Sequence, residues 1–313
     1  MRIVIPGGSG LLGRSLSKAL LQDGHEVVVL TRSLQPGVVV HESNNVDLPG
    51  LTNAGWQPDG TNGVGSWARL IDGATAVVNL TGEPIASKRW SVAQKACIRD
   101  SRVLGTRSVV GAIRAASDPP VTLVNASAIG YYSNRGDEEL IEDSAPGNDF
   151  MAKCCIDWEA EAHKAEGIVE RVVILRTGIA LDQTGGALHK MLPPFKMFVG
   201  GQLGSGRQYM SWIHYADWVD LVRWALVTEE VTGIFNATAP EPVTNSEFSK
   251  ALGRALHRPS LLPAPAFALR LMLGEMADAL LLGGQRVQPS RALKLGFRFN
   301  FSTISQALGA ILQ

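Results

Sequence analysis

Short apolar runs alternate with helical stretches through the first 180 residues. Runs of the kind that form buried strands occur at residues 3–5, 26–30, 76–80, 121–125 and 172–176. Between them, Leu12, Leu16 and Leu20 repeat at helical spacing, and residues 93–116 and 150–166 also predict helices. Strands that alternate with helices form a parallel sheet covered on both faces. The pattern therefore predicts an α/β fold with a doubly wound parallel sheet.

The amino-acid composition changes after Gly185 and Gly186. Pro and Gly become frequent, and the chain from residue 261 is rich in Pro and Leu. A helix at residues 217–227 and a short strand at 233–236 are expected to return to the first domain. We therefore predict a nucleotide-binding domain at 1–184, to which 211–238 return. A smaller substrate-binding lobe is expected to comprise 185–210 and 239–313.

A glycine-rich turn follows the first predicted strand and opens the first predicted helix. Gly7 and Gly8 permit a tight turn, Gly10 lets the backbone approach a pyrophosphate, and Gly13 lets the helix pack closely on the strand. Unpaired N–H groups and the helix dipole favour phosphate at the helix N-terminus. A second strand follows Gly24, and this context favours a dinucleotide site in a Rossmann fold over a purely structural turn.

The second predicted strand ends in Thr31, Arg32 and Ser33. An NAD-preferring fold usually has Asp or Glu here, which accepts from the ribose 2′-hydroxyl. A guanidinium and two hydroxyls instead suit the 2′-phosphate of NADP, which a carboxylate would repel. The alternative is that Arg32 is a solvated loop charge. This strand end predicts NADP(H) as the cofactor.

Composition and charge argue against several classes of protein. The 313 residues are 45% hydrophobic, enough for a large core. Lys and Arg total 29, as do Asp and Glu, so no bulk charge favours nucleic acid or an anionic membrane. Prolines interrupt the apolar segment 261–273, and the first apolar run breaks at residues 6–8, so neither a span nor a secretory signal is expected. Cys97, Cys154 and Cys155 have no metal-ligand spacing. We expect a cytoplasmic monomer or homodimer with a small-molecule substrate and no metal.

Ten short blocks are spread over the whole chain. They are GGSGLLG from Gly7, NLTGEPI from Asn79, KRW from Lys88, SR from Ser101, SAIGYY from Ser127, DWE from Asp157, LRTG from Leu175, GSGRQ from Gly204, SWIH from Ser211 and APEPVTN from Ala239. Together they resemble the atypical extended short-chain dehydrogenase/reductases known as epimerase family proteins. The resemblance implies a Rossmann fold with NADP(H), closed by a small C-terminal domain.

The resemblance also implies a set of cofactor contacts for the pyrophosphate, the 2′-phosphate, the riboses and the nicotinamide. In chain order they are Gly7, Ser9, Gly10, Leu11, Gly13, Thr31, Arg32, Leu80, Thr81, Arg102, Thr177 and Ala180. From the residues alone, Arg102 could equally form a surface salt bridge. Thr177 could be a plain strand-end residue.

The catalytic residues of this superfamily are only partly present. Short-chain dehydrogenases use Ser or Thr after the fifth strand and a Tyr-x-x-x-Lys pair on the next helix, where Lys lowers the Tyr pKa. Ser127 fits the first role. Aligning Glu159 with the acid four residues after that Lys puts Met151 at the Tyr position and Cys155 at the Lys position. Lys153 cannot substitute, because two residues along a helix turn a side chain by about 200°.

Tyr131 follows Ser127 closely and is the predicted proton-transfer group. A phenol with a pKa near 10 needs a cationic neighbour to act as a base, and Lys88, Arg89 and Arg207 are candidates. The alternative is that Tyr131 and the next tyrosine cap the core. Cys155 has no His near it in sequence, so it is more typical of a small buried side chain than of a nucleophile.

Arg89, Arg207 and His214 are the candidate substrate residues. Cations near the mouth of a cleft would favour an anionic substrate, although they could also be solvated loop charges. His214 could be structural or could donate a proton. The sequence thus predicts an NADP(H)-dependent oxidoreductase or epimerase-like enzyme that transfers hydride on a polar carbonyl, alcohol or nucleotide-sugar-like substrate. The missing dyad keeps open a non-catalytic NADP(H)-binding redox sensor.

Overall fold

The computed structural model describes residues 1–41, 50–60 and 65–312. Its main sheet has eight strands in the order β12-β8-β6-β5-β1-β2-β4-β3. Their bounds are β1 (Arg2–Pro6), β2 (Glu26–Thr31), β3 (Val39–His41), β4 (Leu51–Gly55), β5 (Ala76–Asn79), β6 (Thr122–Ala128), β8 (Arg171–Thr177) and β12 (Gly233–Ala237). Within this sheet the strands pair in parallel, except that β3 is antiparallel to β4. The strand order reverses between β1 and β5, where ligands bind in open α/β sheets.

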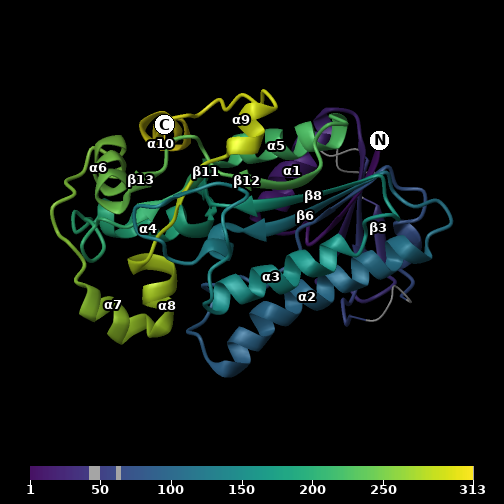
Figure 1. Ribbon diagram of the computed structural model, residues 1–313, viewed down its shortest axis with the longest axis horizontal. Coiled ribbons are helices and arrows are strands. Elements are labelled where there is room, and N and C mark those ends of the chain that lie inside the picture. Colours follow the sequence, from purple (N-terminus) through teal and green to yellow (C-terminus); the bar gives the residue numbers. More distant parts are fainter. Residues whose placement is uncertain (42–49, 61–64, 313) are drawn as a thin grey trace.

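Both faces of this sheet are covered by helices (Figure 1). Successive strand residues point to opposite faces, so Ile3 and Ile5 belong to one core cluster and Val4 to the other. Helices α1 (Leu11–Gln22) and α5 (Tyr215–Val227) cover the first face. Helices α2 (Val92–Ala115) and α3 (Phe150–His163) cover the second. The predicted fold class, a Rossmann-type doubly wound sheet, is confirmed.

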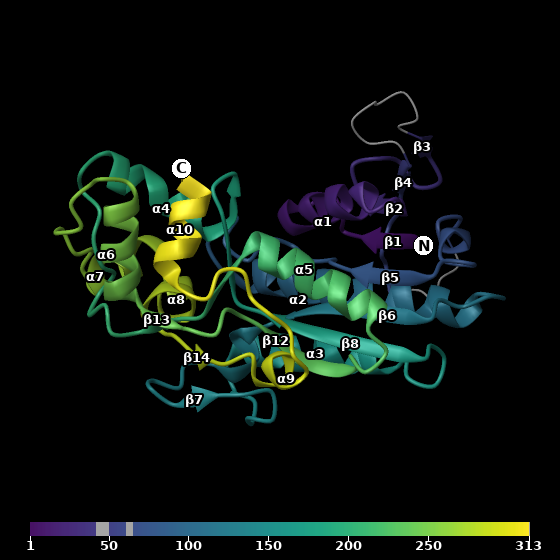
Figure 2. The ribbon, with the colours of Figure 1, turned by 90° about the horizontal axis from the view of Figure 1, so that it is seen from above.

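A third hydrophobic cluster lies beyond the carboxyl ends of the strands (Figure 2). Its helices are α4 (Gly186–Lys196), α6 (Asn245–Ala255) and α10 (Ile304–Leu312), with α7 (Ala266–Leu273) and α8 (Glu275–Ala277) beside them. The described residues also form helix α9 (Ser290–Lys294) and three small two-stranded pairs. They are β9 (Ile179–Asp182) with β11 (Trp212–His214), β10 (Tyr209–Met210) with β13 (Val243–Thr244), and β7 (Glu139–Leu140) with β14 (Arg286–Val287).

Several elements were not expected from the sequence. Strands β3 and β4 extend the sheet beyond β2, and α4 contains Pro193 and Pro194. Helix α6 begins with a capping box in which the Thr244 hydroxyl and the Glu247 carboxylate each accept from the other's backbone N–H. Among the described residues, no helix is long and apolar enough to cross a membrane.

Candidate cofactor and catalytic site

The glycine-rich turn joins β1 to α1 at the switch point of the sheet. Gly7 has a left-handed φ of 76°, and a Cβ there would lie 2.7 Å from the carbonyl oxygen of Leu80. A Cβ at Gly13 would lie 2.5 Å from the Cα of Gly8, so this glycine lets α1 pack on the turn. A Cβ at Gly10 would meet only the Gly7 carbonyl oxygen, at 3.4 Å. The surface over Gly10 is therefore open to a ligand.

The N-terminus of α1 suits an anion. Gly10 is its N-cap residue, no side chain caps it, and its first turn contains no acidic residue. The first-turn N–H groups and the helix dipole thus present positive charge above the turn. The Leu11 side chain points toward the turn before α4, since a Cβ at Gly185 would lie 3.0 Å from its Cδ1. The C-terminal lobe therefore approaches the glycine-rich turn at Leu11.

Three hydroxyls gather where the turn meets the end of β2. The Oγ atoms of Ser9 and Ser33 lie 3.3 and 3.2 Å from Thr31 Oγ1. Thr31 is buried, whereas Ser9, Ser33 and Arg32 are exposed. The Arg32 guanidinium lies 3.6 Å from the carboxylate of Glu83, which follows β5. Arg32 therefore extends across the end of β1, and its one partner among the described residues is a weak contact to the half-buried Glu83.

A buried polar network holds the ends of β5 and β6. The Thr81 hydroxyl donates to Asn79 Oδ1 at 2.7 Å, and the Asn79 amide donates to Thr106 and Asn125 at 2.8 and 2.7 Å. Leu80 donates its N–H to the Pro6 carbonyl at 2.8 Å, which ties β5 to the glycine-rich turn. The network fixes the backbone of residues 80–81 beside Gly7.

Arg102 lies partly buried on α2 behind this segment. Its Nη1 donates to the carbonyls of Glu83 and Ile98, at 3.0 and 2.8 Å, and its guanidinium lies 5.2 Å from the centre of the Trp158 ring. Burial lowers the pKa of Arg102. Arg102 therefore supports the loop after β5 and is not an ordinary surface ion pair.

Thr177 is the last residue of β8, and Ala180 lies three residues later, on the other side of the turn. Thr177 Oγ1 accepts from the Trp218 indole at 3.1 Å, and Ala180 lies in β9, opposite Ile213 of β11. The Thr177 hydroxyl is thus engaged within the protein. Its backbone lies at the carboxyl end of the sheet with the other predicted contacts.

Ser127 is held by a buried ion pair. Its hydroxyl donates to Glu159 Oε1 at 2.6 Å, and the same carboxylate accepts from Arg176 Nε and Nη2 at 2.9 and 2.8 Å. The Arg176 and Glu159 side chains are 2% and 6% exposed. Burial alone would lower the pKa of Arg176, but its hydrogen bonds to Glu159 and the charge of that carboxylate raise it on balance. Ser127 therefore gives its only proton to a carboxylate.

Tyr131 stacks on the same arginine. The Arg176 guanidinium carbon lies 3.3 Å from the centre of the Tyr131 ring, so the expected cationic neighbour is Arg176, not Lys88, Arg89 or Arg207. The next tyrosine, Tyr132, is fully buried and hydrogen-bonded to Arg176 and Asn236. Burial raises the Tyr132 pKa to about 12. Tyr131 is thus the more accessible of the two phenols.

The dyad positions of α3 are apolar and packed. Met151 is 8% exposed and Cys155 is 1% exposed, and a Cβ at Gly130 would lie 3.2 Å from the Met151 Cβ. Burial raises the pKa of the Cys155 thiol to about 12, so it carries no thiolate at neutral pH. Lys153 is exposed, away from this surface. These side chains pack against the segment that follows Ser127, with the Cys155 thiol 3.6 Å from the Ala128 carbonyl oxygen, and they supply no charge there.

The candidate substrate residues lie apart. Arg89 lies against the turn between α7 and α8, where a Cβ at Gly274 would be 3.1 Å from its guanidinium, and Arg207 is exposed before β10. His214 caps α5, because its Nδ1 accepts from the Ala216 N–H at 3.1 Å, and its ring stacks on Phe301. Burial lowers the His214 pKa to about 4. A neutral, packed imidazole is poorly suited to donate a proton.

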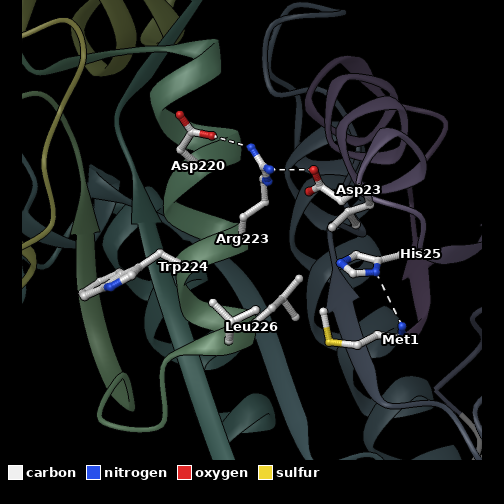
Figure 3. A pocket seen from close by; sticks show the side chains of 9 residues that line it. Met1, Asp23, His25, Asp220, Arg223, Trp224 and Leu226 are labelled. Atoms are coloured by element: carbon white, nitrogen blue, oxygen red, sulfur yellow. Dashed lines mark hydrogen bonds and ion pairs between the residues drawn. The ribbon is translucent and has the colours of Figure 1, made fainter.

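A separate cavity lies at the opposite edge of the sheet (Figure 3). Met1 and His25 precede β1 and β2 there, and Arg223 of α5 pairs with Asp23. Ligands of open α/β sheets bind at the carboxyl ends of strands, whereas this cavity lies at their amino ends. It contributes nothing to the candidate site.

Sequence reasoning missed four charged residues at the site. They are Arg14, Glu83, Glu159 and Arg176. Arg176 could have been noticed in the sequence, since a charged residue within an otherwise apolar predicted strand indicates a buried ion pair. Glu159 leaves a similar signal, since it is a charge beside the buried Trp158 on α3.

A glycine-rich turn at the switch point of a doubly wound sheet, followed by an uncapped helix, defines the class of Rossmann-fold dinucleotide-binding proteins. The family model described as the NAD dependent epimerase/dehydratase family matches residues 3–237, and the chain belongs to this family. A second model, for a domain of unknown function (DUF1731), matches residues 264–311. The resemblance to epimerase family proteins is thereby confirmed.

Individual relatives match along the whole chain. It is 42% identical to the chloroplastic epimerase family protein SDR39U1 homolog of Arabidopsis thaliana, over 100% of this chain and 87% of that protein. It is 41% identical to an epimerase family protein of Mycobacterium bovis, over 98% of this chain and 96% of that protein. The crystal structure of human epimerase family protein SDR39U1 (isoform 2) with NADPH is similar, with a TM-score of 0.87 and 32% identity, over 100% of this chain and 99% of that one.

Proposed function

We propose that this protein binds NADP(H) along the carboxyl ends of β1, β2 and β5 and catalyses hydride transfer, as an oxidoreductase or epimerase-like enzyme. The proposal rests mainly on the open N-terminus of α1, which no side chain caps. Beside it lie the hydroxyls of Ser9, Thr31 and Ser33 and the exposed Arg32. Amide donors there suit a pyrophosphate, and guanidinium and hydroxyl donors suit a 2′-phosphate. The human relative crystallised with NADPH supports the same cofactor.

The residues near Ser127 would orient the substrate. Bound NADP(H) supplies the nicotinamide carbon that gives or takes hydride. Because the Ser127 proton is engaged by Glu159, its Oγ is left to accept a hydrogen bond from a substrate hydroxyl. The Tyr131 phenol, whose ring stacks on Arg176, would exchange a proton with the reacting oxygen of the substrate.

The substrate would be polar and anionic. Lys88 and Arg89 are exposed on the loop after β5, and this loop reaches the C-terminal lobe through the Lys190 ammonium, which donates to the Ala86 carbonyl at 2.8 Å. Arg207 is exposed on the lobe itself. Positive loops on both sides would concentrate a phosphate- or carboxylate-bearing carbonyl, alcohol or nucleotide-sugar-like compound.

A second function is a non-catalytic NADP(H)-dependent redox sensor. Apolar Met151 and Cys155 in place of a proton-transfer pair favour it. Turnover separates the two functions: NADPH oxidation above background with any member of a panel of carbonyls and nucleotide sugars supports the enzyme. Tight cofactor binding without turnover supports the sensor.

Calorimetric titration with NADPH and NADH tests the cofactor directly. NADPH should bind more tightly, and Arg32→Ala should weaken NADPH by about 1.5–3 kcal/mol, the range of a hydrogen bond to a charged group, while sparing NADH. Arg69→Ala, at an exposed arginine of another segment, serves as the matched control. Equal dissociation constants for the two cofactors in the unmodified protein would refute the assignment.

A further inference from the structure

Helix α4 ends in a turn that holds a phenylalanine in an unusual backbone conformation. The N–H groups of Phe198 and Val199 donate to the carbonyls of Phe195 and Pro194, each at 3.0 Å, which is the Schellman arrangement of a helix end. Its left-handed position, usually a glycine, is occupied by Phe198 with a φ of 64°. A bulky residue is strained in this conformation, yet Phe198 is 56% exposed. Packing in the core therefore does not account for it.

Helix α6 ends in a matching turn beside this one. The His257 N–H donates to the Arg254 carbonyl at 3.1 Å, and the Arg258 N–H donates to the Gly253 carbonyl at 2.8 Å. His257 has a left-handed φ of 53°. The Arg258 guanidinium carbon lies 4.5 Å from the centre of the Phe198 ring, so the two turns meet at this contact.

Apolar residues are exposed on both turns. The chain after α6 runs beside the end of α4, because the Leu262 N–H donates to the Gly200 carbonyl at 3.3 Å. The apolar tip, as we call this exposed group, consists of Met197, Phe198, Val199, Leu261 and Leu262. Helix α7, at the same end of the molecule as α6 (Figure 1), exposes Phe267, Leu271 and Met272 as well. A contiguous exposed group of this kind marks an interaction surface.

The surroundings of the apolar tip are basic. Residues 186–204 and 250–274 contain no Asp or Glu, but they contain Lys190, Lys196, Lys250, Arg254, Arg258 and Arg270. Lys196, Arg254 and Arg258 are exposed, and none of the three has an ion-pair partner among the residues that the structure describes. The chain as a whole has a net charge of zero, so this excess is local. A surface that is both apolar and basic is complementary to an anionic bilayer.

A second copy of the chain fits this surface poorly. In a twofold dimer the same patch meets itself. Lys196, Arg254 and Arg258 would then face the same cations, and neither 186–204 nor 250–274 offers a carboxylate to pair with them. An anionic bilayer supplies negative charge in its headgroups and an apolar environment directly below them.

We propose that the apolar tip attaches this protein peripherally to anionic lipid bilayers, with Phe198 and its apolar neighbours among the acyl chains and Lys196 and Arg258 at the headgroup phosphates. The strained turn holds the Phe198 ring outward, and Arg258 stacks on that ring. The cation thus lies at the level where the ring enters the headgroup layer, as amphipathic side chains do at membrane interfaces. Cofactor binding plays no part in this attachment.

Flotation of the 313-residue protein with lipid vesicles tests the proposal. The vesicles contain phosphatidylcholine alone or mixed with phosphatidylglycerol, and the mixed vesicles should bind at least about tenfold more tightly. Phe198→Gly should weaken this binding by about tenfold. Its melting temperature should stay equal or rise, because glycine is unstrained at a φ of 64°. The double variant Lys196→Gln with Arg258→Gln should weaken binding by roughly twentyfold, about fivefold for each cation.

Matched controls lie elsewhere on the surface. Val227→Ser removes an apolar residue that is 67% exposed at the end of α5. Lys18→Gln with Arg69→Gln removes two exposed cations from other segments. Both control proteins should bind the mixed vesicles as the unmodified protein does.

Three outcomes would overturn the proposal. The unmodified protein could fail to bind the mixed vesicles. Binding lost in the cation variant but unaffected by Phe198→Gly, or lost equally in the controls, would mean charge attraction without insertion of the apolar tip. Self-association without lipid, measured by sedimentation velocity and abolished by Phe198→Gly, would assign the apolar tip to a second copy of the chain.

Discussion

Arg176 and Glu159 form a two-pronged buried ion pair behind the candidate catalytic serine. The arginine comes from β8 and the glutamate from α3, and both carboxylate oxygens are engaged at 2.9 and 2.8 Å. Ser127 of β6 lies directly opposite Arg176 in the sheet register. The pair therefore joins two strands and a helix at the end of the sheet where the substrate is expected. Its geometry decides how Ser127 presents its oxygen.

Removing one member of this ion pair should destabilise the folded protein. We expect Glu159→Gln to reduce the free energy of unfolding by about 3–5 kcal/mol, because Arg176 remains buried without its counter-charge. Urea denaturation of the unmodified and variant proteins measures the change. A double variant, Glu159→Leu with Arg176→Met, should be more stable than either single variant. A loss below about 1 kcal/mol for Glu159→Gln would show that water compensates the charge.

Two glycines of the turn should respond differently to alanine. Gly10→Ala adds a methyl group into open space at an ordinary φ of −72°, so the melting temperature should change little while NADPH affinity falls. Gly13→Ala forces a Cβ to within 2.5 Å of the Gly8 backbone, so stability itself should fall. Thermal unfolding and cofactor titration of both variants separate the effects. Equal losses of stability would contradict the assignment of Gly10 to the ligand.

The positions of the glycine-rich turn and of the end of β2 agree with the sequence prediction, whereas the roles of their residues stay predictions. The glycine-rich turn and the end of β2 are short segments whose chemistry depends on adjacent residues. Strands β3 and β4 were not predicted, because residues 39–41 and 51–55 are short and not strongly apolar. Helix α4 was not predicted, because Pro193 and Pro194 within it are residues that usually end a helix.

The network around Ser127 could not be predicted in the same way. Its members lie 32 and 17 residues apart on three different elements, and their contact depends on the register of β6 with β8 and on the rotation of α3. Neither quantity follows from hydrophobic periodicity alone. The sequence therefore pointed to cations on loops as neighbours of Tyr131. In the structure the cation beside Tyr131 is Arg176, which lies within strand β8.

Glu83 should compete with the cofactor for Arg32. The two side chains lie 3.6 Å apart with 62% and 19% exposure, so the pair contributes no more than about 1 kcal/mol. Glu83→Gln should therefore tighten NADPH binding by about two- to fivefold, since Arg32 no longer has to leave a carboxylate. The control is Glu139→Gln, which removes a carboxylate 3.6 Å from Arg286 on another surface. Weaker NADPH binding in Glu83→Gln would mean that Glu83 positions Arg32.

His214 should make stability depend on pH. Burial lowers its pKa from 6.5 to about 4, so the unfolded chain binds this proton more tightly than the folded protein does. Its contribution to stability is fully present above pH 6.5 and decreases as the pH falls toward 4. Between pH 7 and 4.5 the unmodified protein should lose about 2–3 kcal/mol from this group.

The variant His214→Asn isolates this effect. Asn can cap α5 in the same way but does not titrate, so the difference in unfolding free energy between the two proteins should shrink or reverse as the pH falls. Denaturation at pH 7, 6, 5 and 4.5 measures it. A difference independent of pH would show that the folded protein admits water to the imidazole.

Proton transfer should depend on Ser127 and Tyr131 and not on Cys155. The Cys155 thiol is buried with a pKa of about 12, so Cys155→Ala should leave kcat nearly intact once a substrate is found. Ser127→Ala removes the oxygen that would hold the substrate hydroxyl, and Tyr131→Phe removes the accessible phenol. Each should reduce kcat by about 10²–10⁴-fold with cofactor affinity unchanged. A hundredfold loss in Cys155→Ala beside an unaffected Tyr131→Phe would move the chemistry from the loop after β6 to α3.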